Sequence, residues 1–229
     1  MQNYICVMDI QDNLDFFKNE IPEHVTLVAV SKTKPIEDLQ VAYEAGQRIF
    51  GENRVQEMAE KQGKMPDDAQ WHMIGHVQRN KVKYMAEFVT LVHSVDSPRL
   101  CKAIDKEAAK HDRIIDCLLQ VHIAEEESKY GFDDQSLFDF IYSPEFEGLK
   151  HIRVRGLMGM ATLTDDQHKI RNEFRHLKKL YDLLKSDEKL PSGHQVDILS
   201  MGMTGDYKIA IDEGANMVRI GSAIFGKRD

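Results

Sequence analysis

A lysine stands where a buried strand is expected to end. Lys32 follows the mostly apolar run 26–31 and precedes Thr33, Lys34 and Pro35, so it lies where a strand should give way to a helix. A charged amine is costly to bury, so Lys32 must pair with an anion, extend to solvent or lose its proton. A neutral lysine amine is a nucleophile that can form a Schiff base with an aldehyde. The plainer alternative is a lysine that extends its ammonium group into water.

The chain alternates eight apolar, strand-like runs with helical patterns, and these elements would form the fold that positions Lys32. In the clearest helical pattern, over 165–185, Thr164 and Gln167 have the spacing of a capping box. The alternation predicts an α/β fold, a closed (β/α)8 TIM barrel that forms a single domain over residues 1–229. An open doubly wound sheet is the alternative. The predicted strands are 26–31, 48–51, 71–75, 91–95, 115–123, 154–161, 196–201 and 217–220.

Glycine and hydroxyl residues crowd the expected ends of the seventh and eighth strands. TIM barrels carry their functional groups just past the carboxyl ends of the strands and often bind phosphate after strands seven and eight. Glycines let backbone N–H groups approach an anion, and hydroxyl side chains add donors. Because tight turns need glycine in any case, glycines alone do not indicate a phosphate site. Their location after strands seven and eight is what favours one. The glycine and hydroxyl residues at these two ends include Ser200, Gly202, Thr204, Gly221 and Ser222.

An amine at the first strand end and a phosphate-binding cup at the last two fit an aldehyde joined to a phosphate. Pyridoxal 5′-phosphate is the economical ligand of this kind. Gly156 and Gly159 in the sixth strand indicate a bend or the close approach of something flat, which a cofactor ring would suit. A phosphate-binding barrel without an aldehyde ligand is the alternative.

Other polar side chains lie near the ends of the first, third and fifth strands. His72 and His76 lie four residues apart, but on a strand and its loop rather than on a helix, so we expect no metal site. His72 is expected to form a hydrogen-bonding wall. Lys34 either adjusts the proton balance of Lys32, serves as a reserve amine or lies in solvent. Lys129 is a secondary candidate in a polar loop that could equally be a solvated rim.

Composition limits the class of protein. The chain is 42% apolar and 30% charged with a formal net charge of −8, which is typical of a soluble globular protein and disfavours a nucleic-acid partner. The amino terminus has neither a basic region nor a long apolar segment, so we expect no secretion and no membrane partner. Cys6, Cys101 and Cys117 are widely spaced, which favours a reducing cytoplasm over a disulfide framework.

Six segments, in colinear order over about residues 25–228, carry a family resemblance. They are 29–35, 50–53, 71–75, 155–158, 200–203 and 217–226. They closely resemble the pyridoxal phosphate homeostasis proteins, also called the proline synthetase co-transcribed family. The resemblance implies the barrel of the alanine racemase amino-terminal domain, known as fold type III. Because the chain ends a few residues past the eighth strand, we expect it to lack the carboxyl-terminal β domain of those racemases.

The resemblance also implies a role for individual residues. Lys32 would carry the cofactor as an internal aldimine, and Arg219 would face the pyridine nitrogen. Asn53 and His72 would line the pocket. Met201 would be a further cofactor-binding residue. The residues around the phosphate would be Gly202, Met203, Thr204, Gly221 and Ser222.

The resemblance favours one of two functions. The favoured one is a protein that holds pyridoxal phosphate, serves its homeostasis and delivers it to apo enzymes with little or no catalysis, because racemases of this fold take a catalytic tyrosine from the second domain. A protonated Arg219 would keep the pyridine nitrogen neutral and weaken the ring as an electron sink. The alternative is an amino-acid racemase of low activity, with Lys34 or Lys129 as second base. We expect a cytoplasmic monomer with no catalytic residue.

Overall fold

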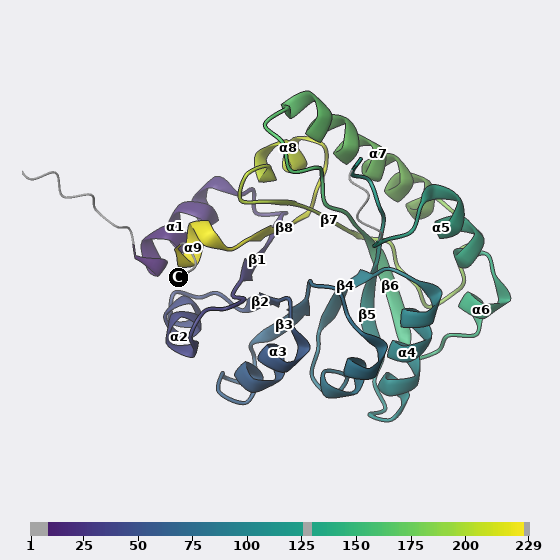
Figure 1. The fold of residues 1–229 in the computed structure, drawn as a ribbon, viewed down its shortest axis with the longest axis horizontal. Helices are drawn as coiled ribbons and strands as arrows, with labels where there is room; N and C mark the ends of the chain where they lie inside the picture. Colours follow the sequence, from purple (N-terminus) through teal and green to yellow (C-terminus); the bar gives the residue numbers. More distant parts are fainter. Residues whose placement is uncertain (1–8, 126–129, 227–229) are drawn as a thin grey trace, which may run out of the picture.

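Eight parallel strands close into a barrel in the computed structural model, which describes residues 9–125 and 130–226 (Figure 1). Each strand pairs with its neighbours in chain order, and β1 pairs with β8 to close the sheet. The predicted TIM barrel is therefore confirmed, and the open doubly wound sheet is excluded. The strands are β1 (Thr26–Val30), β2 (Ile49–Glu52), β3 (Gln70–Met73), β4 (Leu91–Val95), β5 (Ile115–Gln120), β6 (Ile152–Met158), β7 (Ile198–Met203) and β8 (Met217–Ile220).

Helices surround the barrel and connect its strands (Figure 1). The longest begins after Asp166, whose carboxylate accepts the N–H groups of His168 and Lys169. Asp166 therefore caps this helix in place of the predicted Thr164, because it directly precedes the first turn. The helices are α1 (Ile10–Glu20), α2 (Ile36–Glu44), α3 (Val55–Gln62), the 3-10 helix η1 (Arg79–Tyr84), α4 (Pro98–Ala109), α5 (Asp134–Ile141), α6 (Pro144–Glu147), α7 (Gln167–Lys185), α8 (Tyr207–Asp212) and α9 (Ser222–Phe225).

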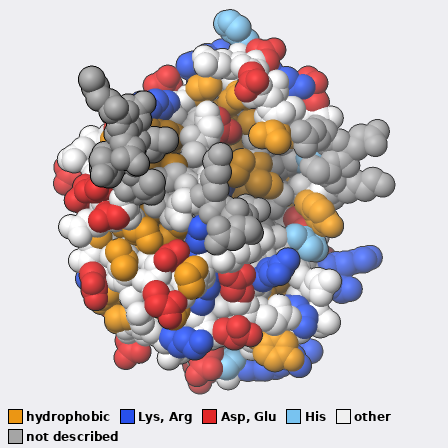
Figure 2. All heavy atoms as spheres, turned by 60° about the vertical axis from the view of Figure 1, so that its left-hand side comes forward, with side chains coloured by type: hydrophobic (Ala, Val, Ile, Leu, Met, Phe, Trp, Pro, Cys, Tyr) orange, Lys and Arg blue, Asp and Glu red, His pale blue; other side chains and the backbone are white. Residues whose placement is uncertain are grey.

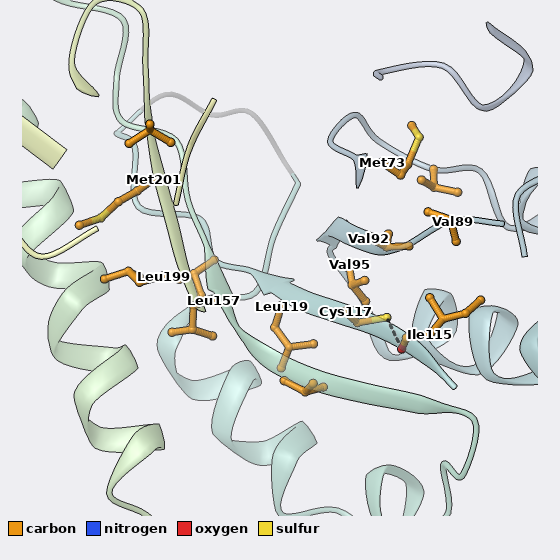
Figure 3. Packing of buried hydrophobic residues seen from close by; sticks show 14 of the residues in the cluster. Met73, Val89, Val92, Val95, Ile115, Cys117, Leu119, Leu157, Leu199 and Met201 are labelled. Atoms are coloured by element: carbon orange, nitrogen blue, oxygen red, sulfur yellow. Dashed lines mark hydrogen bonds between the residues drawn. The ribbon is translucent and has the colours of Figure 1, made fainter. Parts of the chain in front are cut away.

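Alternating strand residues divide the apolar core into an inner and an outer layer. Val28 of β1 packs with side chains from β4, β5, β6 and β8 in a small inner cluster, whereas its neighbour Ala29 belongs to the larger outer cluster. Figure 3 shows part of the outer cluster on β4 to β7, including Cys117 and Leu199. Lys32 has the same parity as Val28 and lies two residues past the end of β1.

Gly156 interrupts the alternation of β6. Cys117 of β5 pairs with Val154, but Leu118 pairs with Gly156, so one residue of β6 is left over in a bulge. Gly156 has φ +146°, and a Cβ there would lie 1.8 Å from the carbonyl oxygen of Ile198. The neighbouring strand therefore requires this glycine. The approach of a flat ligand, which the sequence suggested, is not needed to explain it.

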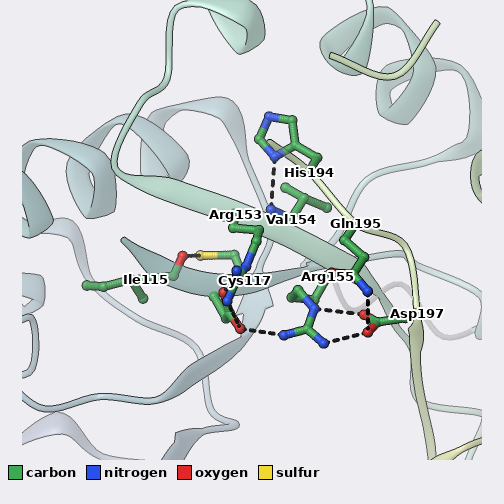
Figure 4. Close-up of polar contacts among 9 residues, drawn as sticks. Ile115, Cys117, Arg153, Val154, Arg155, His194, Gln195 and Asp197 are labelled. Carbon is green, nitrogen blue, oxygen red and sulfur yellow. Dashed lines mark hydrogen bonds and ion pairs between the residues drawn. The ribbon is translucent and has the colours of Figure 1, made fainter. Parts of the chain in front are cut away.

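An ion-pair network joins β5 and β6 to the residue that precedes β7, at the amino-terminal end of these strands (Figure 4). Arg155 Nη1 lies 2.7 Å from Asp116 Oδ2, and Arg155 Nε lies 2.7 Å from Asp197 Oδ1. Arg153 binds the same Asp116 carboxylate through two further contacts of 2.7 and 3.0 Å. These pairs connect the strands at the end of the barrel opposite the predicted site.

The face of the molecule in Figure 2 mixes acidic and basic side chains with scattered apolar ones. The net charge of −8 is therefore not expressed as one uniform acidic surface on this face. Within residues 9–125 and 130–226, no helix combines the length and the apolar character needed to span a bilayer.

Candidate functional site

A cavity of about 500 Å³ opens at the carboxyl-terminal ends of the barrel strands. Residues at or just past the ends of β1, β2, β3, β5, β6, β7 and β8 line it, which is the expected location of a functional site in a TIM barrel. We call this cavity the barrel pocket. Of the residues singled out in the sequence, it brings together Lys32, Lys34, Asn53, Met203, Thr204, Arg219, Gly221 and Ser222.

Lys32 enters the barrel pocket from a tight turn after β1. The Lys34 N–H donates to the Ser31 carbonyl oxygen at 3.1 Å and closes this turn. Thr33, between the two lysines, has φ +64°, a conformation that β-branched residues rarely adopt. Both lysines line the pocket, and Lys32 is half-buried. The turn therefore delivers two amines to one cavity.

Asn53 follows β2, lines the barrel pocket and carries an unpartnered amide oxygen. Its Oδ1 is buried and has no hydrogen-bond partner among the described residues. Gly75 packs directly against this residue, and a Cβ on Gly75 would lie 2.4 Å from the Asn53 carbonyl oxygen. An unsatisfied buried polar atom costs about 1–3 kcal/mol. A ligand with a matching polar group would remove that cost.

Arg219 is a buried cation on β8 that lines the barrel pocket. Its Nη1 donates to Ser200 Oγ at 2.6 Å and to the Ser200 carbonyl oxygen at 3.0 Å, and its Nη2 donates to the Gly159 carbonyl oxygen at 3.0 Å. Burial lowers the pKa of Arg219 to about 10, although Asp206 opposes the shift. Arg219 therefore stays protonated at neutral pH and is held in one orientation.

Two buried histidines continue the hydrogen-bond chain from Ser200. His93 Nδ1 lies 3.0 Å from Ser200 Oγ, and His93 Nε2 lies 3.0 Å from His72 Nδ1. Burial lowers the pKa of His72 to about 3 and that of His93 well below its usual range, so both rings are neutral. Because Arg219 can only donate, we assign the Ser200 hydroxyl proton to the bond with His93 and the His93 Nε2 proton to the bond with His72.

His72 therefore differs in location from what the family resemblance implied. It is 3% exposed and does not line the barrel pocket. Its strand position turns it into the barrel interior, where hydrogen bonds through His93 and Ser200 connect it to Arg219 of the pocket. With the protons assigned as above, His72 accepts a hydrogen bond from His93 within the core.

The loops after β7 and β8 bring several predicted donors to the barrel pocket. Thr204, Gly221 and Ser222 line it, and Gly221 directly precedes the short helix α9. Met203 lines it as well, but its backbone N–H donates to Asp206 Oδ1 at 2.5 Å. The Met203 N–H is thus already engaged, and the remaining backbone and hydroxyl groups are the available anion donors.

Met201 and Gly202 do not line the barrel pocket. Met201 is fully buried in the outer core cluster, where Figure 3 shows it on β7. Gly202 has φ +93°, and a Cβ there would lie 2.6 Å from Ala210 Cβ on α8. Strand alternation and helix packing therefore direct both residues away from the cavity. Lys129, the secondary candidate of the fifth loop, lies outside the described residues.

Some pocket residues were not predicted from the sequence. His76 Nδ1 lies 2.8 Å from Asp96 Oδ2, and its ring centroid lies 4.3 Å from that of Tyr130. The spacing to His72 had drawn attention to His76, but only as a metal ligand. Loops have no periodic pattern that reveals which side chains point inward. The sequence therefore could not show that these loop residues line the pocket. The residues concerned are His76, Gln120, Tyr130 and Met160.

Comparison with known proteins agrees with this geometry. Residues 5–229 match the family model described as alanine racemase, N-terminal domain. A pyridoxal phosphate homeostasis protein of Pasteurella multocida is 40% identical over 210 residues, which cover 90% of this chain and 87% of the relative. One of Aquifex aeolicus is 39% identical over 204 residues, which cover 88% of this chain and 86% of the relative.

Solved structures with the same fold include PipY of Synechococcus elongatus with PLP bound, at a TM-score of 0.86 and 34% identity. The match covers 95% of this chain and 100% of PipY. Alanine racemase of Clostridium difficile shares the fold at a TM-score of 0.74 and 14% identity, over 96% of this chain and 56% of the racemase. The chain thus belongs to the pyridoxal phosphate homeostasis proteins, within the larger family that shares the alanine racemase amino-terminal domain.

Proposed function

We propose that the barrel pocket binds pyridoxal 5′-phosphate (PLP) and that Lys32 holds it as a Schiff base. The observation that carries this proposal is that Lys32 and Arg219 reach one cavity beside the glycine and hydroxyl loops of β7 and β8. PipY, which is 34% identical to this chain, has PLP bound in its solved structure. When bound, PLP supplies an aldehyde that condenses with amines and a ring that delocalises negative charge.

The residues of the pocket fit this group. Asn53 presents a buried, unpartnered amide oxygen to a ligand that carries several polar substituents. Thr204, Ser222 and the backbone around Gly221 offer hydroxyl and N–H donors for a phosphate. Arg219 is a fixed, protonated donor that matches an unprotonated ring nitrogen.

Lys32 forms the covalent bond in this proposal. Its neutral Nζ would be the nucleophile toward the aldehyde of the bound cofactor, whose oxygen would be released as water. An amine of another molecule would compete with Lys32 for the same aldehyde. Lys34 lines the same pocket, so a second amine lies in the cavity that Lys32 reaches.

We further propose that the protein serves intracellular PLP homeostasis with little or no catalysis of its own, and that apo PLP-dependent enzymes receive the cofactor. The names of its relatives support a homeostatic role. To test delivery, holo-protein is mixed with an apo enzyme whose activity is followed. Recovery beyond a control with the same amount of free PLP is expected, and recovery equal to that control would contradict delivery.

The oligomeric state and the cellular location of the protein can each be tested. We propose that it works as a monomer in the cytoplasm. Analytical ultracentrifugation of the holo-protein is expected to give a single species of 26.3 kDa plus cofactor, and a dimer would contradict the first statement. Recovery from the membrane fraction of lysed cells would contradict the second.

An amino-acid racemase of low activity is the second candidate. The observation that favours it is the pair of titratable side chains, His76 and Tyr130, that line the pocket besides its lysines. Such groups can exchange a proton at a carbon next to an amine. Exchange of the α-proton for solvent deuterium, followed by NMR for the common amino acids, would identify this activity. No exchange above that of free PLP would exclude it.

Absorbance spectroscopy tests the Schiff base itself. Wild-type protein mixed with PLP is expected to show the band of a protonated Schiff base, which borohydride reduction removes. Lys32→Ala is expected to show the spectrum of the free aldehyde, whereas the matched control Lys34→Ala keeps the Schiff-base band. If wild type and Lys32→Ala give the same spectrum, Lys32 is not the attachment point.

A further inference from the structure

A buried ion cluster holds the residue that precedes Lys32. The cluster consists of Lys61, Glu52 and Glu57. Lys61 Nζ donates to the Ser31 carbonyl oxygen at 2.8 Å, and the Ser31 hydroxyl donates to Glu52 Oε1 at 2.6 Å. The backbone and the side chain of Ser31 are therefore both fixed from α3 and β2.

The same cluster holds the residue that follows Lys32. Glu57 Oε1 accepts the Thr33 N–H at 2.5 Å, and Thr33 is held at φ +64°. This left-handed conformation is unfavourable for a β-branched residue, so it persists only where contacts impose it. Lys61 Nζ joins the two sides, because it lies 2.7 Å from Glu57 Oε1 and 2.8 Å from Glu52 Oε1.

Burial shows that this cluster is costly. The Lys61 side chain is 9% exposed and the Glu52 side chain is not exposed at all. Glu52 Oε2 has no partner among the described residues, and desolvation raises the pKa of Glu52 against the opposing effect of Lys61. Buried ion pairs contribute little net stability compared with apolar side chains of similar size. The arrangement is better explained by its contacts with Ser31 and Thr33 than by the stability it adds.

We propose that Lys61, Glu52 and Glu57 are positioning residues that direct Lys32 into the barrel pocket. They anchor Ser31 and Thr33, the two neighbours of Lys32, and impose the strained turn between β1 and α2. Lys32 thereby points at its reaction partner before that partner arrives, which lowers the entropic cost of forming the covalent bond. This inference rests on the proposed binding of PLP and names the residues that prepare the site for it.

The test compares two ligands that differ only in the reacting group. PLP carries an aldehyde, and pyridoxine 5′-phosphate carries an alcohol that cannot form a Schiff base. In Lys61→Met, the affinity for PLP and the rate of Schiff-base formation are expected to fall by about tenfold or more, because a reacting amine has lost its orientation. The affinity for pyridoxine 5′-phosphate should change by no more than about twofold, since the phosphate loops are intact.

Two matched variants show whether the effect is specific. Lys64→Met makes the same chemical change at an exposed lysine near the end of α3, and it should bind both ligands like wild type. Glu57→Ala removes the acceptor of the Thr33 N–H from a site that is 21% exposed, so it tests the same role without leaving a buried charge unpaired. A loss in PLP affinity of about threefold is expected there.

A backbone rescue separates positioning from general packing. Glycine adopts positive φ without strain, so Thr33→Gly should let the turn form with less help from the cluster. Adding Thr33→Gly to Lys61→Met is expected to reduce the loss of PLP affinity from about tenfold to about threefold or less. An undiminished loss would show that the cluster does not act through the Thr33 backbone.

The outcomes distinguish this inference from the proposed function. If wild type forms no Schiff base at Lys32, the proposed function fails. If wild type forms one and both Lys61→Met and Glu57→Ala form it equally fast and tightly, the positioning role fails while the proposed function stands. If Lys61→Met weakens both ligands to the same extent, the cluster supports the pocket in general and the positioning role is overturned.

Discussion

Arg219 Nη1 lies 2.6 Å from Ser200 Oγ and 3.0 Å from the Ser200 carbonyl oxygen, so a single serine fixes one side of the guanidinium group. The Gly159 carbonyl oxygen accepts from Nη2 at 3.0 Å and fixes the other side. These uncharged acceptors orient the cation without neutralising it. A positive charge of fixed direction is therefore available to whatever occupies the barrel pocket.

Loss of the Ser200 hydroxyl should destabilise the fold. In Ser200→Ala, His93 Nδ1 and Arg219 each lose a buried partner, which is expected to cost about 1–3 kcal/mol of unfolding free energy. Urea unfolding measures the change. Ser192→Ala, at an exposed serine, should stay within about 0.5 kcal/mol of wild type. Equal stabilities of the two variants would contradict the assigned hydrogen-bond chain.

The neutral histidine pair should make stability depend on pH. The pKa of folded His72 is about 3 and that of His93 is also lowered, whereas both titrate near pH 6.5 in the unfolded chain. The unfolded state therefore binds more protons as the pH falls below about 6.5, so stability is full above that pH and is lost on acidification toward pH 3. Each histidine contributes a slope of up to about 1.4 kcal/mol per pH unit.

A single substitution tests this pH dependence. His72→Leu is expected to reduce the slope of unfolding free energy against pH between about pH 4.5 and 6.5, because one titrating group is removed. His111→Gln, at an exposed histidine, should leave the slope unchanged. The slope is obtained from urea unfolding at a series of pH values. A wild-type slope in His72→Leu would mean that His72 is not held neutral in the fold.

Asn53 should matter for binding more than for folding. Asn53→Ala removes a buried oxygen that has no partner in the protein, so the unfolding free energy should change by less than about 1 kcal/mol. The affinity for PLP is expected to fall by about tenfold, as for the loss of one buried hydrogen bond. Fluorescence titration and urea unfolding check the two effects, with Asn172→Ala on the exposed face of α7 as control. Undiminished PLP affinity would show that Asn53 does not contact the ligand.

The bulge glycine should be essential to the barrel. In Gly156→Ala, a methyl group would collide with the Ile198 carbonyl oxygen and a positive φ would be strained, so a loss of about 3 kcal/mol or more is expected. Gly63→Ala is the matched control, because a Cβ there meets no atom within 4 Å and its φ is −69°. Thermal unfolding compares them. Similar melting temperatures would contradict the bulge as the reason for Gly156.

The barrel could be predicted because its strands are short apolar runs in a regular alternation. The strands 91–95 and 217–220 agree with the prediction at both ends. Others differ at their ends by one to three residues. After β5, for example, the predicted strand continues to 123 because Val121 and Ile123 are apolar as well. In β6 the bulge at Gly156 shifts the alternation, and no periodic pattern reveals such a shift.

The candidate site could be predicted where a residue follows directly from a strand. Lys32 keeps the parity of β1 and Arg219 that of β8, so both reach the pocket. His76 and Tyr130 lie in loops, whose conformation depends on tertiary contacts such as the one between their rings. The Lys61 cluster was missed because the contacts of α3 with Glu52 and with the two neighbours of Lys32 form only when this helix packs on the barrel.

Chemical trapping followed by peptide mapping tests the central claim most directly. Holo-protein is reduced with borohydride, digested, and analysed by mass spectrometry for the lysine that carries the reduced pyridoxyl group. Modification at Lys32 with a stoichiometry close to one is expected, and it should be lost in Lys32→Ala. Modification at another lysine, or no modification in wild type, would contradict it.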